Sequence, residues 1–359
     1  MKKRIVLIFL GDFFYDGRCI NMANSIINNG YELYVIDTGK SKNAYKGIIF
    51  FHIKIKKNGF FRYVDYYLKT KKIINKIKPQ TIIASDLYSL PSAFSLKNTD
   101  VIYDSREIYS QHAGMINNRI KQYFWHMVEN KFIKNTKAVL VTADGDELIL
   151  NKLYDNLNII KIYNFPSCKM KSNKNNLLRK KINLSENKKI FLYQGVLHAG
   201  RGIKSMISLL NYFSEVHAVI IGDGPNKKNI INFVKKNNLI HKVHFLGKIK
   251  YEELLQFTSG ADIGFSIIRP ISKSYEQALP NKIFEYALSE VPIICSDLIE
   301  MKKIVQKYQI GIAVPFNDIE KQIMGVKKIL RNKKYFITKS KNSDFIWESQ
   351  EIFFMKVIN

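Results

Sequence analysis

The chain has 359 residues, 46% of them hydrophobic, and a formal net charge of +27. This length exceeds one typical domain and fits two, each with its own core, and no apolar run approaches the roughly 20 residues of a membrane-spanning helix. Three widely spaced cysteines without a Cys/His cluster predict a reducing, cytosolic compartment and no structural zinc.

The positive charge narrows the classes of partner. A strongly basic chain attracts nucleic acid, an anionic membrane surface or phosphorylated substrates. The charge is uneven, because residues 251–300 hold three Lys and Arg against eight Asp and Glu. No recognised nucleic-acid-binding motif occurs, so we expect no nucleic-acid partner.

The first half of the chain alternates apolar strands with helices. Residues 1–14 predict a strand rather than a signal peptide, because Asp12 interrupts the apolar run early. A helix over 18–29 should end at Gly30, and a basic, aromatic helix over 63–78 should end at Pro79. Strands are predicted at 4–10, 32–37, 48–53, 81–85, 101–104 and 138–142.

Residues 168–190 are polar and basic, which predicts an inter-domain link with one solvated helix. The alternation then restarts. Strands are predicted at 190–193, 217–221, 243–246, 263–266 and 292–295, and helices at 203–213, 226–237, 251–258, 280–289, 319–331 and 340–357.

This order of elements predicts an α/β protein. We expect a first domain over 1–167, a second over 168–339, and a C-terminal helix within 340–359. Both domains should hold parallel sheets. Ligands of such sheets bind at the carboxyl ends of the strands, here in a crevice between the two domains.

The segment 279–297, LPNKIFEYALSEVPIICSD, joins a helix start to a short buried strand. Pro280 suits the first helical turn, where its missing N–H would be unsatisfied anyway. Glu285 lies among apolar neighbours near the helix start. A carboxylate there either caps its own helix or serves a ligand.

The loop QGVLHAGRG at 194–202 follows a predicted strand and opens a predicted helix. Its three glycines allow the backbone to approach a ligand closely, and a helix N-terminus favours phosphate. Arg201 adds a cation that can donate two parallel hydrogen bonds to phosphate oxygens. The alternative is a plain strand–turn–helix connection.

These two segments resemble the donor site of the retaining glycosyltransferases of family 4, of the type that assembles bacterial polysaccharides and other glycans. The resemblance covers nearly the whole chain and is densest over 191–315. It implies the GT-B fold, with two Rossmann-like domains whose parallel sheets face a central cleft. The segment 345–354 resembles the family's last helix, which crosses back to the first domain.

The resemblance also implies roles for the donor site. A helix that opens Pro-Asn-Lys-x-x-Glu carries the glutamate that hydrogen-bonds the ribose of a nucleoside-diphosphate sugar, here Glu285. The residues implied in donor binding are Gly195, Gly200, Gly202, Lys204, Gly247, Gln277, Asn281, Lys282 and Glu285. Arg201 is expected to stabilise the diphosphate that leaves. No metal and no other cofactor is expected, because no Asp-x-Asp motif precedes a strand end.

Two donor-site positions depart from the family. The arginine that many members have just after the first glycine of the loop is Val196 here, and we expect Lys204, one turn later, to replace part of its charge. The acidic residue eight positions before the helix glutamate is Gln277, which can hydrogen-bond a sugar but cannot act as a base. This departure bears on the identity of the donor sugar.

The first domain carries a third segment, YDSREIY at 103–109, which resembles the family's Tyr-Asp-Ser-His-Glu. Arg106 replaces the histidine and stays protonated, so it is expected to hold a phosphate rather than act as a base, with Glu107 beside it. The alternative is a charged turn that caps the next helix. In the first loop, Gly11, Asp16 and Arg18 are candidates for the acceptor or phosphate, although the last two could form only a surface salt bridge.

The segment 58–78 mixes aromatic and basic residues. Such a helix can lie on an anionic membrane or pack with a basic solvent face. Because many relatives glycosylate lipid-linked acceptors, we expect a cytoplasmic protein, peripheral on the inner face of the cell membrane, that takes a glycan or lipid-linked acceptor.

The resulting hypothesis is a metal-independent, retaining glycosyltransferase. Two alternatives remain. One is a GT-B protein that hydrolyses or epimerises a nucleotide-sugar, and the other is a degenerate, non-catalytic partner subunit. The second alternative is motivated by Arg106 and Gln277. The sequence leaves open the donor sugar, the nucleobase of the donor, the acceptor and the oligomeric state.

Overall fold

The computed structural model describes residues 2–40, 44–109, 118–170, 173–341 and 345–359. The chain divides into two compact units. The first comprises Met1–Tyr163 with Trp347–Asn359, and the second comprises Asn164–Ile346. The sequence analysis placed its domain boundaries after residue 167 and before residue 340.

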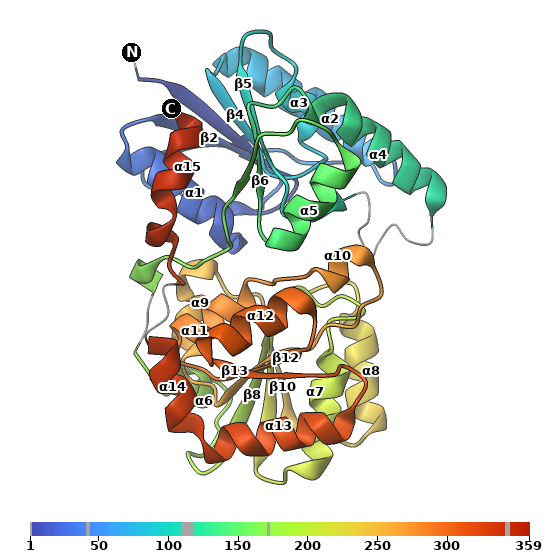
Figure 1. The fold of residues 1–359 in the computed structure, drawn as a ribbon, viewed down its shortest axis with the longest axis vertical. Coiled ribbons are helices and arrows are strands. Elements are labelled where there is room, and N and C mark those ends of the chain that lie inside the picture. The colour runs from blue at the N-terminus through green and yellow to red at the C-terminus, as the bar shows by residue number, and fades with distance from the viewer. Residues whose placement is uncertain (1, 41–43, 110–117, 171–172, 342–344) are drawn as a thin grey trace. The chain divides into compact units, whose positions relative to one another are not determined.

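The described part of the first unit is built on a parallel seven-stranded sheet in the order β3-β2-β1-β4-β5-β6-β7 (Figure 1). Its strands are β1 (Arg4–Ile8), β2 (Glu32–Asp37), β3 (Ile48–His52), β4 (Thr81–Ala84), β5 (Asp100–Asp104), β6 (Ala138–Val141) and β7 (Ile159–Lys161). Its α-helices are α1 (Gly17–Asn28), α2 (Phe61–Ile77), α3 (Leu90–Ala93), α4 (Arg119–Ile133), α5 (Asp144–Leu153) and α15 (Glu351–Ile358). The near-continuous apolar runs of β1, β4 and β6 are buried, as expected for parallel strands covered on both faces.

Local signals place the first helix. Asp16 caps α1 by accepting a hydrogen bond from the backbone N–H of Cys19 at 2.9 Å. Gly30 follows the helix with a φ of 82°, which confirms the predicted left-handed stop.

The C-terminal helix belongs to the first unit, although residues 164–346 intervene. Figure 1 shows α15 beside α1. Trp347 Nε1 donates to Ser25 Oγ at 2.8 Å, and Lys3 Nζ donates to the carbonyl of Ile358 at 2.5 Å. The predicted return of the last helix to the first domain agrees with this packing.

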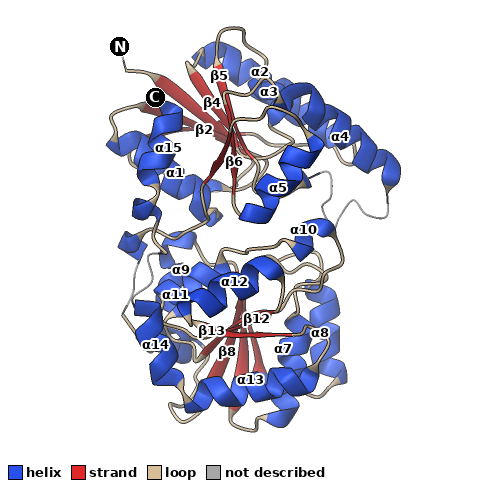
Figure 2. Ribbon diagram, in the orientation of Figure 1, coloured by secondary structure: helices blue, strands red, loops and turns tan. Residues whose placement is uncertain are grey.

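The described part of the second unit holds a parallel six-stranded sheet in the order β10-β9-β8-β11-β12-β13, with helices on both faces (Figure 2). Its strands are β8 (Lys189–Gln194), β9 (Val216–Ile221), β10 (Val243–Gly247), β11 (Ile263–Ser266), β12 (Ile293–Ser296) and β13 (Gly311–Val314). Its α-helices are α6 (Leu177–Lys181), α7 (Ile203–Leu209), α8 (Lys227–Lys236), α9 (Tyr251–Thr258), α10 (Lys273–Glu276), α11 (Lys282–Leu288), α12 (Ile299–Tyr308), α13 (Ile319–Arg331) and α14 (Lys333–Lys341).

The predicted helix over 340–357 is wrong in extent. In the structure, α14 ends at Lys341, a 3-10 turn covers Trp347–Ser349, and α15 begins at Glu351. Phe345 lies between them and is buried against Phe284 and Tyr308. Burial of Phe345 in the second unit and of Trp347 in the first prevents one continuous helix across this point.

Each sheet has one position where the strand order reverses, between β1 and β4 in the first unit and between β8 and β11 in the second. Ligands of open parallel sheets bind at the carboxyl ends of the strands beside such a position. The predicted donor residues, apart from Gly247 at the end of β10, lie on the segments that follow β8 and β11. Within the described residues, no helix is long and apolar enough to cross a membrane.

Candidate functional site

The loop after β8 has a backbone that only glycine adopts readily. Gly195, Gly200 and Gly202 have φ values of 122°, 77° and 66°. A Cβ atom on Gly202 would lie 2.2 Å from the carbonyl oxygen of Ile267, and the backbone N–H of Arg269 donates to the carbonyl of Gly200 at 2.8 Å. The loop is therefore held against the segment that leaves β11.

The turn after β9 supports the same loop from the other side. The backbone N–H of Gly195 donates to Ile221, and that of Leu197 donates to Asp223. A Cβ atom on Gly222 would lie 2.0 Å from the carbonyl oxygen of Gly195. The VIIGDGP segment at 219–225 is thus a structural support for the loop.

Arg201 is held by an aromatic side chain that the sequence analysis did not name. Its Nε donates to Tyr275 Oη at 3.1 Å, and its guanidinium carbon lies 4.5 Å from the Tyr275 ring centroid. Tyr275 lies on α10, which Ser272 caps by accepting from the Tyr275 backbone N–H. Among the residues that the structure describes, no carboxylate forms an ion pair with Arg201. The guanidinium thus keeps donors for an anionic ligand.

Glu285 reaches across to the end of β8. Gln194 Nε2 donates to Glu285 Oε2 at 2.5 Å, while Thr258 Oγ1 donates to Gln194 Oε1 at 2.8 Å. Burial raises the pKa of the Glu285 carboxyl, against the smaller effects of Gln194 and Lys282. This hydrogen bond joins Glu285 to the strand end and not to the amides of its own helix.

The lysines of the donor site lie in different surroundings. Lys282, at the start of α11, is buried with Nζ 3.6 Å from the ring centroid of Tyr193. Lys204 is exposed on α7, and its Nζ lies 5.3 Å from the ring centroid of Phe233 on α8. α7 itself ends at Leu209 and continues as a 3-10 turn, so the predicted helix over 203–213 is shorter than expected.

The remaining donor candidates lie on neighbouring loops. Gln277 follows α10 and is half-buried, and Asn281 precedes α11 without a side-chain capping bond. Gly247 ends β10 with a φ of 72°, and its carbonyl accepts from the backbone N–H of Gly222 at 2.7 Å. The structure places all three at the carboxyl edge of the second sheet, around the loop after β8.

In the first unit, the predicted residues form a buried ion-pair network. Arg18 Nη2 lies 2.7 Å from Asp104 Oδ1, and Arg106 Nε lies 2.9 Å from Asp104 Oδ2. Arg106 Nη1 pairs with Asp16, and its Nη2 donates to Cys19 Sγ at 2.9 Å. The suggested surface salt bridge between Asp16 and Arg18 is therefore wrong, since Asp16 pairs with Arg106 and Arg18 pairs with the buried Asp104.

The charges in this network stabilise one another. Burial would raise the pKa of Asp104, but the two arginines hold it below its usual range. Burial would lower the pKa of Arg106, yet the carboxylates beside it raise it well above its usual range. Its side chain is 16% exposed. Arg106 is a fixed cation that ties the loop after β1 to the end of β5.

The neighbours of this network are also placed. The carbonyl of Gly11 accepts from the backbone N–H of Thr38 at 2.9 Å, and the carbonyl of Glu107 accepts from Ser105 Oγ at 3.2 Å. Asn118, not the 104–107 turn, caps α4. His112, which follows the turn in sequence, lies outside the described residues.

A further carboxylate joins the loops at the reversal point of the first sheet. Asp86 follows β4 and accepts from the backbone N–H of Leu10 at 2.5 Å and of Ser89 at 2.7 Å. Burial raises the pKa of Asp86. Sequence reasoning missed Asp86, Gln194 and Tyr275. Asp86 and Gln194 lie at the ends of the strands beside the two reversal points. They could be found from the sequence only if the strand order were known.

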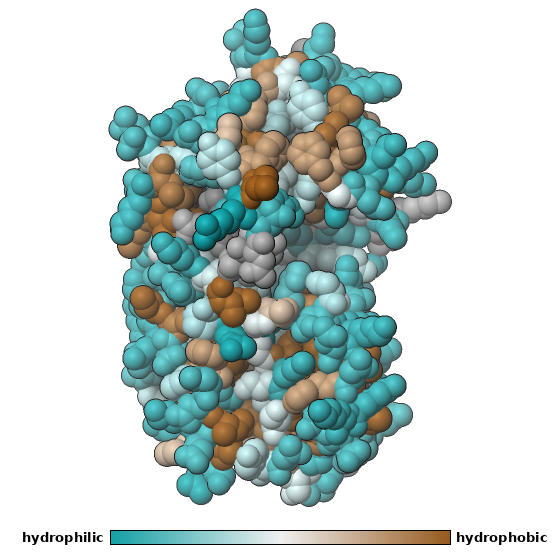
Figure 3. Space-filling view, turned by 90° about the vertical axis from the view of Figure 1, so that its right-hand side faces the viewer, coloured by the Kyte–Doolittle hydropathy of each residue, from teal (hydrophilic) through white to brown (hydrophobic). Residues whose placement is uncertain are grey.

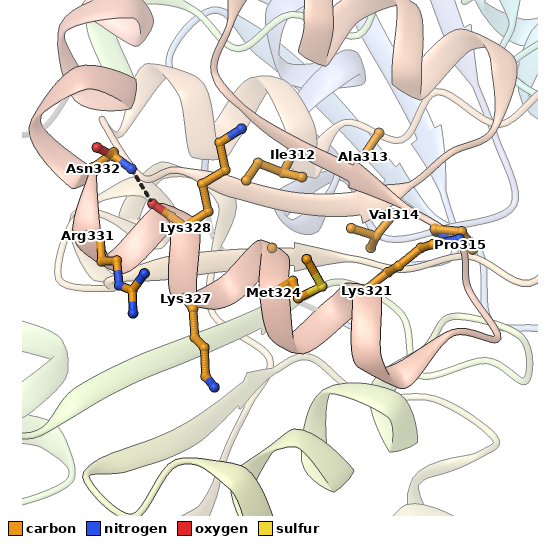
Figure 4. Close-up of a pocket in the computed structure, with 11 residues that line it drawn as sticks. Ile312, Ala313, Val314, Pro315, Lys321, Met324, Lys327, Lys328, Arg331 and Asn332 are labelled. Atoms are coloured by element: carbon orange, nitrogen blue, oxygen red, sulfur yellow. Dashed lines mark hydrogen bonds between the residues drawn. The ribbon is translucent and has the colours of Figure 1, made fainter.

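One groove of the second unit contains none of the predicted residues. It has a volume of about 530 Å³ and lies between β13 and α13 (Figure 4). Its floor includes Ile312 and Val314, and Lys327, Lys328 and Arg331 line one side. Among the residues that the structure describes, no group of three or more His, Cys, Asp or Glu side chains is placed to hold a metal ion.

Comparison with known proteins agrees with this geometry. Residues 174–344 match the family model described as glycosyl transferases group 1. The match spans β8 to β13 and therefore includes Arg201, Lys282 and Glu285. Among the curated proteins compared with the chain, none matches significantly.

Solved structures share the fold over nearly the full chain. Sucrose-phosphate synthase from Thermosynechococcus elongatus is 17% identical with a TM-score of 0.82, over 99% of this chain and 98% of that one. WaaG, a glycosyltransferase involved in lipopolysaccharide biosynthesis, is 14% identical with a TM-score of 0.75, over 97% and 98%. Anabaena Alr3699/HepE, solved with UDP-glucose, is 13% identical with a TM-score of 0.76, over 99% of both chains.

The two kinds of comparison carry different conclusions. The structures establish the fold, two α/β units with parallel sheets of seven and six strands. The family match over the second unit establishes the class of enzyme. The chain is a glycosyltransferase with the GT-B fold.

Proposed function

We propose that this enzyme is a retaining transferase of the family 4 type, which moves a sugar from a nucleoside-diphosphate sugar to a glycan or lipid-linked acceptor without a metal ion. The observation that carries the proposal is the site of the second unit, where Arg201 and the glycine loop lie with Glu285 at the carboxyl edge of the sheet. The similar HepE structures, which hold UDP or UDP-glucose, support a nucleotide-sugar donor.

Each residue then has a role that follows from its chemistry. Arg201 and the amides of the glycine loop stabilise the negative charge that develops on the leaving diphosphate. Glu285, held by Gln194, accepts hydrogen bonds from the ribose. In the first unit, Arg106 stays protonated and cannot act as a base. We assign the proton of the acceptor hydroxyl to the leaving phosphate. Asp16, Arg18 and Arg106 position the loops beside the acceptor.

The first experiment is a thermal-shift panel of UDP, GDP, ADP and CMP with their sugars, in the presence and absence of EDTA. A ligand that binds only the folded state stabilises it by about 2.7 kcal/mol at a hundredfold excess over its Kd. We expect one nucleotide to stabilise the protein with or without EDTA. Loss of the shift in EDTA, restored by added metal, would overturn the metal-independent proposal.

Turnover with the selected donor tests the mechanism. Arg201→Ala should lower transfer by about 2–4 kcal/mol of transition-state stabilisation, while Lys328→Ala, at an exposed lysine of α13, should not. A decrease below about threefold for Arg201→Ala contradicts its role. Nuclear magnetic resonance of the product gives the anomeric configuration, which must match that of the donor. Sugar release without an acceptor would instead indicate a hydrolase. Absence of binding to any nucleotide would indicate a non-catalytic subunit.

The exposed surface of the first unit supports a peripheral membrane protein, cytoplasmic and on the inner face of the membrane. Large apolar side chains line the outer faces of α2 and α4 at three- and four-residue spacing. They form an apolar ridge of Phe60, Phe61, Val64, Leu68, Ile120, Tyr123, Phe124 and Met127. The rings of Phe60 and Phe124 lie 5.4 Å apart between centroids, which joins the two helices.

Cations border this ridge. Arg62 and Lys72 on α2 are exposed, as are Arg119 and Lys121 on α4. Figure 3 shows apolar side chains gathered among hydrophilic ones on the upper part of one face. Apolar side chains bordered by cations suit the surface of an anionic bilayer, where a lipid-linked acceptor would be held.

A further inference from the structure

Lys282 has an environment that is unusual for a lysine. Its side chain belongs to a residue that is 8% exposed, and Nζ lies 3.6 Å from the ring centroid of Tyr193. Among the residues that the structure describes, no carboxylate forms an ion pair with it. Lysine is almost never buried without a partner, because loss of water around the ammonium costs free energy. An anionic ligand bound beside Nζ would supply the missing partner.

The ammonium group lies at the first glycine of the loop after β8. A Cβ atom built on Gly195 would be 3.5 Å from Lys282 Nζ and 3.7 Å from Cε. Gly195 has a φ of 122° and is fixed by its hydrogen bond to Ile221. Lys282 and Arg201 thus border the same glycine loop, one at each end.

The loop itself lacks its expected second cation. Val196, the residue after the first glycine, is 56% exposed and carries no charge. Lys204, which is expected to replace part of this charge, is exposed, and its Nζ lies 5.3 Å from the ring centroid of Phe233. Lys282 Nζ lies beside Gly195, the residue that precedes Val196.

We propose that Lys282 supplies the second cation for the diphosphate, and that it takes up a proton from the solvent when the diphosphate binds. This inference rests on the proposed function, since it specifies how the same site holds its donor. No covalent step is involved, and one proton moves from buffer to Nζ for each diphosphate bound.

The groups around Nζ explain the coupling. Burial lowers the pKa of Lys282 well below its usual range, the like charge of Arg201 lowers it further, and Glu285 opposes both. Tyr193 lies under the ammonium group, and burial raises the pKa of Tyr193 above its usual range. Tyr275 holds Arg201. A diphosphate adds negative charge beside Nζ, which favours the protonated form.

Calorimetry of UDP binding tests both parts of the proposal, with GDP and ADP as alternative probes. The titration is done at pH 8, where the terminal phosphate is already ionised, in two buffers of different ionisation enthalpy. The dependence of the measured enthalpy on the buffer gives the number of protons taken up. We expect uptake approaching one proton for the unaltered enzyme.

Three variants separate the possible outcomes. Lys282→Met should weaken UDP binding about tenfold or more and abolish proton uptake. Lys282→Arg should keep part of the affinity but take up no proton, because arginine is always charged. The control, Lys328→Met, at an exposed lysine of α13, should change neither quantity. Thermal unfolding of each variant shows that it is folded, and we expect Lys282→Met to be at least as stable as the unaltered enzyme.

Two results overturn the inference. One is UDP affinity in Lys282→Met within about twofold of the unaltered enzyme, and the other is unchanged proton uptake in that variant. Both leave the proposed function intact, because the enzyme still binds the nucleotide. Failure of the unaltered enzyme to bind any nucleoside diphosphate would contradict the proposed function itself.

Discussion

The guanidinium of Arg106 is shared between Asp16 and Asp104, with the thiol of Cys19 against its third nitrogen. Removing one member of such a buried network leaves the opposite charge without a partner, which costs several kcal/mol. A histidine at this position would provide fewer donors. Arg106 thus fixes two loops and, unlike a histidine, cannot transfer a proton.

Glu129 is a second single residue that affects the protein as a whole, because its contribution to the stability of the folded state depends on pH. It is fully buried on α4 and accepts from Tyr103 Oη at 2.8 Å and from Tyr154 Oη at 2.9 Å. Burial raises its pKa from 4.5 to about 7. Its folded pKa is therefore above its unfolded value, so the folded state binds the proton more tightly and stability falls as the pH rises from about 4.5 to 7.

We expect Glu129→Gln, which stays neutral, to lose this dependence. Relative to the unaltered protein, the variant should be more stable at pH 8 than at pH 5, by a difference on the order of 2–3 kcal/mol. Thermal unfolding at the two pH values measures the effect. Glu253→Gln, at an exposed carboxylate on α9, serves as the control. Parallel curves for Glu129→Gln and the unaltered protein would contradict the prediction.

At the scale of elements, two strand-end turns determine the shape of the donor loop. The turn after β9 lies against the loop after β8, and only hydrogen atoms of Gly222 fit beside the carbonyl of Gly195. A glycine in a turn is common. Its importance here comes from the neighbouring strand, which places a second backbone within contact distance.

Gly222→Ala should therefore damage the site rather than only the turn. Its φ of 136° and the 2.0 Å approach to the carbonyl of Gly195 predict a loss of stability above the roughly 1–2 kcal/mol of positive φ alone, together with weaker nucleotide binding. Gly30→Ala, with a φ of 82° and open space around it, is the matched control and should show only the backbone cost. Thermal unfolding and nucleotide titration check both. Equal effects for the two variants would refute the argument.

At the scale of the whole molecule, the apolar ridge and the charge of +27 are the features that support the proposed association with a membrane. Exposed apolar side chains give membrane affinity through burial, and basic residues add attraction to anionic lipid. Neither feature is needed for the chemistry of the donor site.

Co-sedimentation of the full chain with vesicles tests this proposal. Binding should be stronger to vesicles with a third of anionic lipid than to neutral ones, and should weaken at high salt. The double variant Phe61→Ser with Ile120→Ser should reduce binding about tenfold or more, since both side chains are largely exposed. Met324→Ser, an exposed apolar side chain on α13, should have no effect. Equal binding of the double variant and its control would disprove a role for the ridge.

Some elements could not be predicted from the sequence. α4 and α12 were missed because few of their residues are buried in the core, so their apolar pattern is weak or faces solvent. β13 was missed because it is a short edge strand whose residues are mostly half-buried. In contrast, β2, β11, α9 and α13 were predicted with the bounds that the structure has, since periodicity and flanking turn residues are local signals.

The sequence by itself determined the α/β class, the order of most strands and helices, and the motifs at the ends of β8 and the start of α11. Those properties depend on neighbours within a few residues. Only the tertiary structure decided the partners of the charged groups. Gln194 and Glu285 are 91 residues apart, and Arg106 and Asp16 are 90 apart. Because strand order brings such residues together, and because burial then sets their charge states, no local pattern could specify them.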